Sequence, residues 1–213
     1  MLQMFLLYTS LLLFQLLVEI YCQVSPYTSA RFLHTATLID NKLYILGGYN
    51  GTNLTNGFLT NDFFYLDVSI QFNTQSLSWK DLSSINIVPE HYLATSVKGG
   101  ANNNTLFLYG GLSNTTMALV YTFDPRTNLW SIPNITGNIP DRKFDLTGII
   151  DYNGRMYLWG GIDMVTGNYT NGMLILDTIN LSLSNGNING APIPSGGYSA
   201  TLLPDNRIIY MGK

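Results

Sequence analysis

Two histidines, one cysteine and three regularly placed aspartates are the side chains of this sequence that could do chemistry. His34 and His91 each stand near the start of an alternating apolar run, in two successive segments of similar pattern. A metal site needs more nitrogen, oxygen or sulfur ligands than these two residues supply. We therefore predict a repeated structural role for both histidines, and no metal or cofactor. The single cysteine, Cys22, follows an apolar leader, so removal of that leader would leave no thiol chemistry.

The aspartates also repeat. Asp67, Asp124 and Asp177 each follow a short apolar run, a placement typical of turn residues rather than of catalytic acids. No pair of carboxylates stands out as a general acid and base. The Gly-Gly pairs that end the repeated apolar runs lack the Lys-Ser/Thr and the following helix of a phosphate-binding loop. We expect no catalytic residues within this sequence.

The strongest pattern is a short apolar run that ends in two glycines. It occurs as LYILGG, LFLYGG and MYLWGG, and begins again as IIYMG before Lys213. The paired glycines are Gly47, Gly48, Gly110, Gly111, Gly160 and Gly161. Aligned on these pairs, the chain divides into units at about 31–83, 91–133, 143–185 and 196–213. Repeats of this length indicate the blades of a β-propeller more than the coils of a β-solenoid.

Each complete unit contains four short apolar or alternating runs, which we label a to d. In the first unit they lie at about 33–39, 43–47, 63–68 and 77–82. Run b is aliphatic and aromatic throughout, as in a strand buried on both faces. The a-to-b connections are rich in Asn, Asp and Gly, as in β-hairpins. No segment after the leader has a sustained helical period, so we predict an all-β fold.

An apolar run, two glycines, and then a spaced tyrosine and tryptophan resemble the kelch motif. The first unit has LYILGG…FFYLD…LSW, with Tyr65 and Trp79, and the second has LFLYGG…VYTFDP…NLW, with Tyr121 and Trp130. The third unit has MYLWGG and LILD but no tryptophan after them. The resemblance implies a kelch-type β-propeller of about three four-stranded blades and two strands of a fourth, with strand a innermost. The long b-to-c loops are similar to those of extracellular or fungal kelch proteins and of the galactose-oxidase propeller.

A closed propeller has roughly four to eight blades, so the units of this sequence predict an incomplete ring. We expect a fragment, a truncated product or one part of an assembly. The resemblance leaves two functions open. The first is a non-catalytic protein-interaction module. The alternative is part of a secreted galactose-oxidase-like or other enzyme whose catalytic residues, such as the copper-binding tyrosines and histidines of that family, lie beyond residue 213.

The N-terminus has the composition of a secretory signal. Residues 5–18 are almost wholly apolar, a length that suits a signal peptide better than a membrane span. We predict a signal peptide at 1–22, cleavage after Cys22 and a partial propeller at 23–213. The alternative is an uncleaved anchor through residues 5–18. The protein is expected to be secreted or at the cell surface, and membrane-bound only through this segment or a span beyond the chain.

Seven Asn-x-Ser/Thr sequons make glycosylation a candidate modification if the chain enters the secretory pathway. They are Asn50, Asn53, Asn103, Asn114, Asn134, Asn168 and Asn180. Five are expected on the face that carries the b-to-c and d-to-a connections, and only Asn103 and Asn180 on the other face. If most are occupied, we expect protein ligands on the sparser face, or glycans that take part in recognition.

Binding to a protein or a glycan is the function that these observations leave. The net charge is −3 and only 11% of residues are charged, so the chain lacks the basic surface of a nucleic-acid binder. Kelch propellers commonly bind proteins, and some bind glycans, through the face with the long b-to-c loops. The contacts that this resemblance implies are Tyr49, Arg31, Arg142 and Asp163. Solvated loop residues with no partner are the alternative for all four.

Expression of the full chain in eukaryotic cells tests the secretory prediction. We expect a secreted protein that begins at Gln23 and loses apparent mass when its N-linked glycans are removed enzymatically. Glycopeptide mapping then gives the occupancy of each sequon. Native protein without glycans at Asn50, Asn53, Asn114, Asn134 and Asn168 would contradict a role of glycans in restricting the binding face.

Overall fold

The computed structural model describes residues 30–74, 76–191 and 193–212, and the fold that they form is all-β, as expected. These residues contain twenty strands and one short 3-10 helix, η1 (Ser83–Ile85), and no α-helix. No helix in the described ranges is long and apolar enough to cross a membrane. The predicted signal peptide at 1–22 lies outside them.

Four main sheets follow one another along the chain, one for each predicted unit. The first contains β2 (Thr35–Ile39), β3 (Lys42–Leu46), β6 (Phe63–Asp67) and β7 (Trp79–Asp81). The second contains β8 (Tyr92–Gly99), β9 (Thr105–Leu112), β10 (Val120–Asp124) and β11 (Leu129–Ser131). The third contains β14 (Gly148–Ile150), β15 (Arg155–Trp159), β17 (Met173–Asp177), β18 (Ser182–Asn185) and β12 (Thr136–Gly137). The fourth contains β19 (Ser199–Leu202) and β20 (Ile208–Met211).

Two small sheets flank the main ones. The first contains β1 (Arg31–Phe32), β4 (Tyr49–Asn50) and β5 (Phe58–Leu59). The second contains β13 (Lys143–Phe144) and β16 (Ile162–Asp163). In both, the residues before strand a pair with the residues after the Gly-Gly pair.

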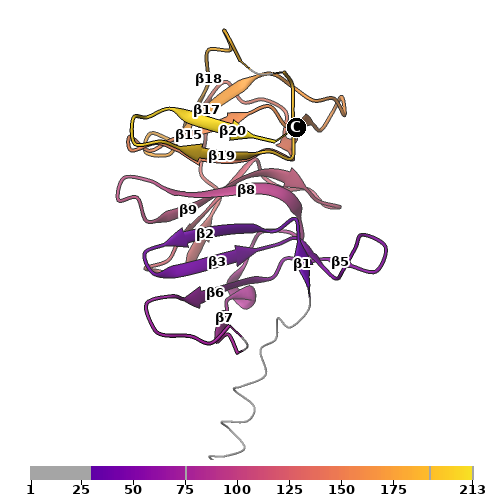
Figure 1. Ribbon diagram of the computed structural model, residues 1–213, viewed down its shortest axis with the longest axis vertical. Coiled ribbons are helices and arrows are strands. Elements are labelled where there is room, and N and C mark those ends of the chain that lie inside the picture. The colour runs from indigo at the N-terminus through magenta and orange to yellow at the C-terminus, as the bar shows by residue number, and fades with distance from the viewer. Residues whose placement is uncertain (1–29, 75, 192, 213) are drawn as a thin grey trace, which may run out of the picture.

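Runs a to d of the first two units become neighbouring antiparallel strands in chain order. The first strands of successive sheets are also neighbours, because β2 contacts β8, β8 contacts β14 and β14 contacts β19. Figure 1 shows the sheets stacked one after another, from β7 at one end to β18 at the other. No sheet of the described residues closes into a ring, so the number of blades stays a prediction.

The second strand of a sheet carries apolar side chains on both faces, so it is buried between two cores. In β9, Leu106 and Leu108 join a core shared with the first sheet, whereas Phe107 and Tyr109 join a core shared with the third. Side chains alternate along a strand, so a single strand supplies both cores. Each such side chain contributes about 1.5–3 kcal/mol when it is fully buried. The double burial expected for run b is confirmed in β9.

The motif tryptophans occupy equivalent positions. Trp79 pairs with Leu66 and Trp130 pairs with Phe123, and both partners directly precede the aspartate that ends their strand. The Trp130 ring lies 5.1 Å from the ring of Phe63 in the first sheet. Trp130 therefore packs between neighbouring sheets, as the large apolar area of its ring favours.

The motif tyrosines, by contrast, are not equivalent. Tyr65 precedes Asp67 by two residues, whereas Tyr121 precedes Asp124 by three. Side chains on a strand alternate between its two faces, so this one-residue offset puts the two tyrosines on opposite faces. Tyr121 corresponds to Phe64 of the first unit. The sequence interpretation that paired Tyr65 with Tyr121 was therefore wrong in its register.

Each Gly-Gly pair forms a joint between two units. All six glycines have positive φ, between 61° and 86°. A Cβ on the first glycine of a pair would strike a backbone carbonyl oxygen of the next unit. The separations would be 2.8 Å for Gly47 and His91, 2.2 Å for Gly110 and Lys143, and 2.6 Å for Gly160 and Ser195. Only glycine combines this backbone conformation with so close an approach.

The second glycine of each pair faces its own unit. A Cβ at this position would meet the carbonyl oxygen of a residue at or just before the start of strand a. The separations would be 2.7 Å for Gly48 and Phe32, 3.0 Å for Gly111 and Tyr92, and 2.8 Å for Gly161 and Phe144. The N–H of the second glycine also reaches the next unit: Gly48 donates to the His91 carbonyl at 2.7 Å, and Gly161 donates to the Ser195 carbonyl at 2.9 Å.

A second set of backbone bonds links the units at the start of their first strands. Leu33, Leu93, Asp145 and Gly197 all have positive φ, between 55° and 63°. The N–H of Leu93 donates to the carbonyl of Leu33 at 3.1 Å, Asp145 donates to Leu93 at 3.0 Å, and Gly197 donates to Asp145 at 3.0 Å. We call these four residues the left-handed relay. The relay joins all four units through peptide groups alone.

Replacement of Gly110 by alanine tests the joint. A matched control is Gly167→Ala, because Gly167 has a similar positive φ and a Cβ added to it would meet no atom within 4 Å. The control substitution should lower the free energy of unfolding by roughly 1–2 kcal/mol, which is the cost of the left-handed conformation for a residue with a Cβ. Gly110→Ala should cost at least about 4 kcal/mol, because the Lys143 carbonyl must also move. Equal losses of unfolding free energy in urea titrations would refute a steric role for the joint.

Candidate interaction face

The b-to-c and d-to-a connections meet on one side of the sheets, which we call the loop face. The small sheet of β1, β4 and β5 builds its first part, and the pair of β13 and β16 builds its third. Figure 1 shows β1 and β5 projecting on this side, opposite the turn that joins β2 to β3. The joints described above fix the base of these connections, so the loop face rests on a rigid scaffold.

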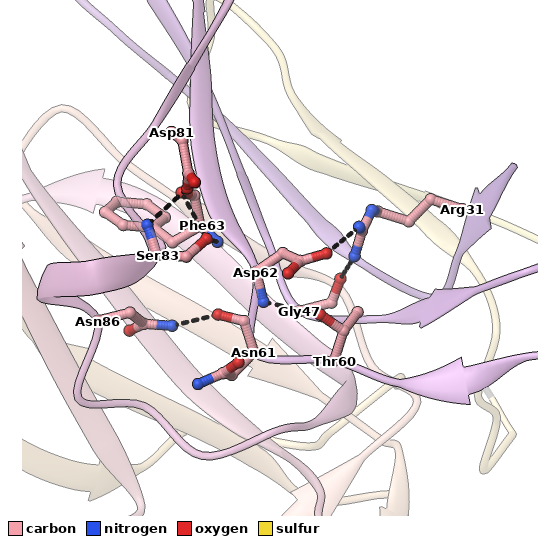
Figure 2. Close-up of polar contacts among 9 residues, drawn as sticks. All are labelled: Arg31, Gly47, Thr60, Asn61, Asp62, Phe63, Asp81, Ser83 and Asn86. Atoms are coloured by element: carbon pink, nitrogen blue, oxygen red, sulfur yellow. Dashed lines mark hydrogen bonds and ion pairs between the residues drawn. The ribbon is translucent and has the colours of Figure 1, made fainter. Parts of the chain in front are cut away.

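Arg31 is a structural cation of the loop face. Its side chain is only 9% exposed; Nη1 donates to the Gly47 carbonyl at 2.8 Å, and Nη2 forms an ion pair with Asp62. The guanidinium also lies 5.3 Å from the centre of the Phe64 ring. Figure 2 shows Arg31 reaching both Gly47 and Asp62. Arg31 was predicted as a partner contact, but the structure uses its charge to hold the b-to-c connection on the first joint.

The d-to-a connection of the first unit is tied to the same region. Ser83 accepts a hydrogen bond from the Phe63 N–H at 3.0 Å, and its own N–H donates to Asp81 at 2.8 Å. The Asn86 side chain donates to the carbonyl of Asn61 at 2.6 Å. Figure 2 shows these contacts beside the Arg31 cluster. Both connections of the first unit are therefore held in place by polar side chains.

Three aromatic rings from two units meet on the loop face. Phe32 of β1 and Tyr49 of β4 are stacked with centroids 5.5 Å apart, and Tyr49 meets Tyr92 of β8 edge-on at 5.1 Å. All three side chains are half-buried. Partly exposed aromatic groups on a rigid base are typical of protein-binding surfaces. Tyr49, a predicted contact, thus lies where a partner could reach it.

Lys143 in the third unit is equivalent to Arg31 and is also used internally. Its ammonium donates to Oγ1 of Thr170 at 3.0 Å, and it stands opposite Asp163 in the β13–β16 pair. Burial lowers the pKa of Lys143 below its ordinary value, and the charge of Asp163 opposes that shift. Asp163 was predicted as a partner contact, but its Oδ1 accepts the N–H groups of Val165 and Thr166 in a tight turn.

Arg142 lies at the seam between the second and third units. It is half-buried, its Nε has no hydrogen-bond partner among the described residues, and it faces the phenols of Tyr109 and Tyr121. The Tyr109 hydroxyl is buried and equally without a partner in the described structure. Of the four predicted contacts, Tyr49 is therefore the clearest candidate for contact with a ligand, whereas Arg142 is partly exposed as a residue but its unpartnered Nε is buried.

The two histidines are not equivalent, contrary to the sequence interpretation. The pairing at the joints makes His91 the counterpart of Arg31 and Lys143, whereas His34 corresponds to Ala94. His91 is 1% exposed; its Nδ1 lies 2.7 Å from the Pro89 carbonyl, and its Nε2 has no partner in the described part of the chain. Its ring fills the space beside Gly47. The structural role predicted for His91 fits this position.

The repeated aspartates close turns, as predicted. Oδ1 accepts the N–H of the residue two positions later in each case: Ser69 for Asp67, Arg126 for Asp124 and Ile179 for Asp177. The pKa of all three carboxyl groups is lowered, chiefly by hydrogen bonds from the Ser69 hydroxyl to Asp67, from the Arg126 side chain to Asp124 and from the Asn180 N–H to Asp177. The described residues contain no group of three His, Cys, Asp or Glu side chains that could hold a metal ion.

Four of the seven sequons lie on the loop face, one lies on the other face and two lie near the outer edge of the third sheet. Asn50, Asn53, Asn114 and Asn168 lie in b-to-c connections on the loop face, and Asn103 lies in an a-to-b turn on the other face. Asn134 was expected with the first group, which is wrong. The chain doubles back after β11, and β12 pairs in parallel with β18, with Thr136 opposite Ser182. Asn134 therefore lies beside Asn180, at the outer edge of the third sheet.

Phe32, Tyr92 and Lys143 are functional or structural residues that the sequence interpretation missed. A signal for them exists, because the first three units each have a basic residue followed by an aromatic one at or just before the start of strand a: RF at 31–32, HY at 91–92 and KF at 143–144. Alignment on the Gly-Gly pairs alone did not reveal it, since the intervening connections differ in length.

The amino-acid sequence is similar to those of known kelch-repeat proteins. The sequence profile described as the KLHDC2/KLHL20/DRC7 Kelch-repeats domain matches residues 33–213. Kelch domain-containing protein 3 of Bos taurus is 26% identical over 194 residues, which cover 86% of this chain and 48% of that protein. Rho GTPase-activating protein gacHH of Dictyostelium discoideum is 28% identical over 170 residues, 73% of this chain and 10% of that protein. The chain thus spans about half the length of the kelch domain-containing relatives that it matches.

His91 predicts a pH dependence of stability. Burial lowers the pKa of its imidazole from 6.5 to about 4 in the folded protein, so the unfolded chain takes up a proton more readily between these two values. Unfolding free energy should therefore be constant above about pH 6.5 and fall by about 3 kcal/mol as the pH drops to 4.

Urea titrations of the wild type and of His91→Gln over this pH range measure the effect. The variant should lose most of the slope between pH 6.5 and 4, because glutamine does not titrate. The carboxylates with lowered pKa, such as Asp67, reduce the free energy of unfolding further only below about pH 4, where they become protonated. A variant that keeps the full wild-type slope would contradict the assignment to His91.

Proposed function

We propose a protein-binding function for this chain, which belongs to the KLHDC2/KLHL20/DRC7 family of kelch-repeat domains. Kelch repeats serve as protein-interaction modules, and the match extends over most of the chain. In our proposal the chain is a non-catalytic module that recognises its partner through the loop face.

The aromatic group of Phe32, Tyr49 and Tyr92 is the observation that carries this proposal. Its rings come from two units, contact one another and stay half-exposed. Aromatic residues lose little conformational entropy on binding and bury a large area, so they are frequent centres of protein interfaces. Arg142, a half-buried residue directly before β13, adds a cation near the same face.

We also propose that the protein is secreted or held at the cell surface and that its sheets belong to a larger propeller. The leader at residues 5–18 and the seven sequons support secretion. Exposed apolar side chains at both ends of the row of sheets support further blades: Leu38 on β2, and Ile209 and Met211 on β20. Neighbouring blades would cover these side chains, which otherwise favour aggregation.

Substitution of Tyr49 by serine tests the binding face. Tyr152→Ser is a matched control, because Tyr152 is 75% exposed in the a-to-b turn of the third unit, on the opposite face. Proteins retained by the immobilised wild-type chain are identified first, and their affinities for both variants are then measured by interferometry. We expect Tyr49→Ser to weaken binding at least about tenfold.

The control variant should bind within about twofold of the wild type. Thermal unfolding of both variants shows whether the fold is intact. Equal affinities of the two variants for every retained protein would place the binding surface elsewhere.

A further inference from the structure

The c-to-d connection of the first unit differs from those of the other units. It runs over residues 68–78, of which Gln75 lies outside the described residues, whereas the corresponding connections are 125–128 and 178–181. This longer segment lies opposite the loop face, at the left of the first sheet in Figure 1, where β6 ends. Turns on that face need only a few residues to join strands c and d, so the extra residues are not required by the sheet.

The longer connection encloses a hollow of about 240 Å³ against β6 and β7. Its floor includes Tyr65 and Leu66, and its wall includes Ile70, Phe72 and Lys80. A cavity of about 150 Å³ accepts a benzene-sized group, so this hollow has room for one aromatic or leucine side chain.

Exposed apolar side chains form the rim of the hollow. Ile70 is 61% exposed and Phe72 is 44% exposed, on a connection with few other apolar residues. Two large apolar side chains held beside an open hollow lose contact with water when a partner covers them, which favours association. The apolar part of a partner would therefore be placed between Phe72 and the floor.

The charges around the hollow favour an acidic partner. The Lys80 ammonium makes no hydrogen bond or ion pair with a described residue. The Lys42 ammonium lies 4.7 Å from the centre of the Tyr65 ring at the base of the hollow. Asp67, the carboxylate on the lining, is occupied by the N–H and hydroxyl of Ser69. Lys80 lines the hollow and Lys42 lies just outside its lining, so these two cations outnumber the single carboxylate on the lining, Asp67, and leave a net positive charge around the hollow.

We propose that this hollow is a second docking surface, which binds a linear segment of a partner protein with acidic residues on either side of one bulky apolar side chain. The apolar side chain enters the hollow beside Phe72, and the acidic residues pair with Lys80 and Lys42. The first unit has no sequon in its a-to-b or c-to-d connection, so glycans of this unit leave the surface open. The surface is independent of the loop face and of its proposed partner.

Fluorescence anisotropy of labelled short peptides with the full chain tests the proposal. The first peptide carries one phenylalanine between glutamates, the second has lysines in place of the glutamates, and the third has alanine in place of the phenylalanine. The first peptide should bind at least about tenfold more tightly than the other two, since it alone has both features. No binding of the first peptide, or equal binding of the lysine peptide, would overturn the proposal.

Two variants with matched controls locate the site. Lys80→Glu and Phe72→Ser should each weaken binding of the first peptide at least about fivefold. The controls are Lys98→Glu, at an exposed lysine of β8, and Phe58→Ser, at an exposed phenylalanine of the loop face. Losses in the controls as large as those in the test variants would show nonspecific binding and overturn the assignment. Thermal unfolding of all four variants verifies their folding.

Discussion

Close approach of two backbones at the Gly-Gly pairs is the constraint on which the rest of this structure depends. The space for a Cβ at Gly110 is already occupied by the Lys143 carbonyl, so the neighbouring units meet with no side chain between them. This contact sets the separation of the sheets near their first strands. The aromatic and aliphatic cores can then fill the widening space farther out, where Phe63, Phe123 and Trp130 pack together.

The repeat itself was predictable from the sequence, whereas the contacts between units were not. Run b is recognisable by composition, and Asp67 and its counterparts reveal their turns by repetition. The register of Tyr65 against Tyr121 was misread, because in strands of five residues an offset of one reverses the face, although the spacing of each tyrosine from the following aspartate carries the correct register. The role of Arg31 depends on Asp62, 31 residues along the chain. The position of Asn134 depends on a parallel pairing of β12 that has no local sequence signal.

The loop face has rigid parts and variable parts. Arg31 and Lys143 each bind the connection of their own unit close to its joint, so the bases of these connections are fixed. The middle of the same connections, such as 52–56 and 164–169, is exposed to solvent. A rigid base with exposed loops suits recognition, because the loops can change sequence without disturbing the core. The half-buried aromatic group lies at the boundary between the two.

The left-handed relay has a consequence for how such a protein can evolve. Its hydrogen bonds run between peptide groups, and the four positions are occupied by leucine, leucine, aspartate and glycine. A linkage that does not depend on the identity of side chains requires no matched pair of mutations when a unit is duplicated. After duplication, each copy can acquire its own loops and surface chemistry while it stays attached to its neighbours. Units as different as those that begin with Arg31, His91 and Lys143 can therefore share one architecture.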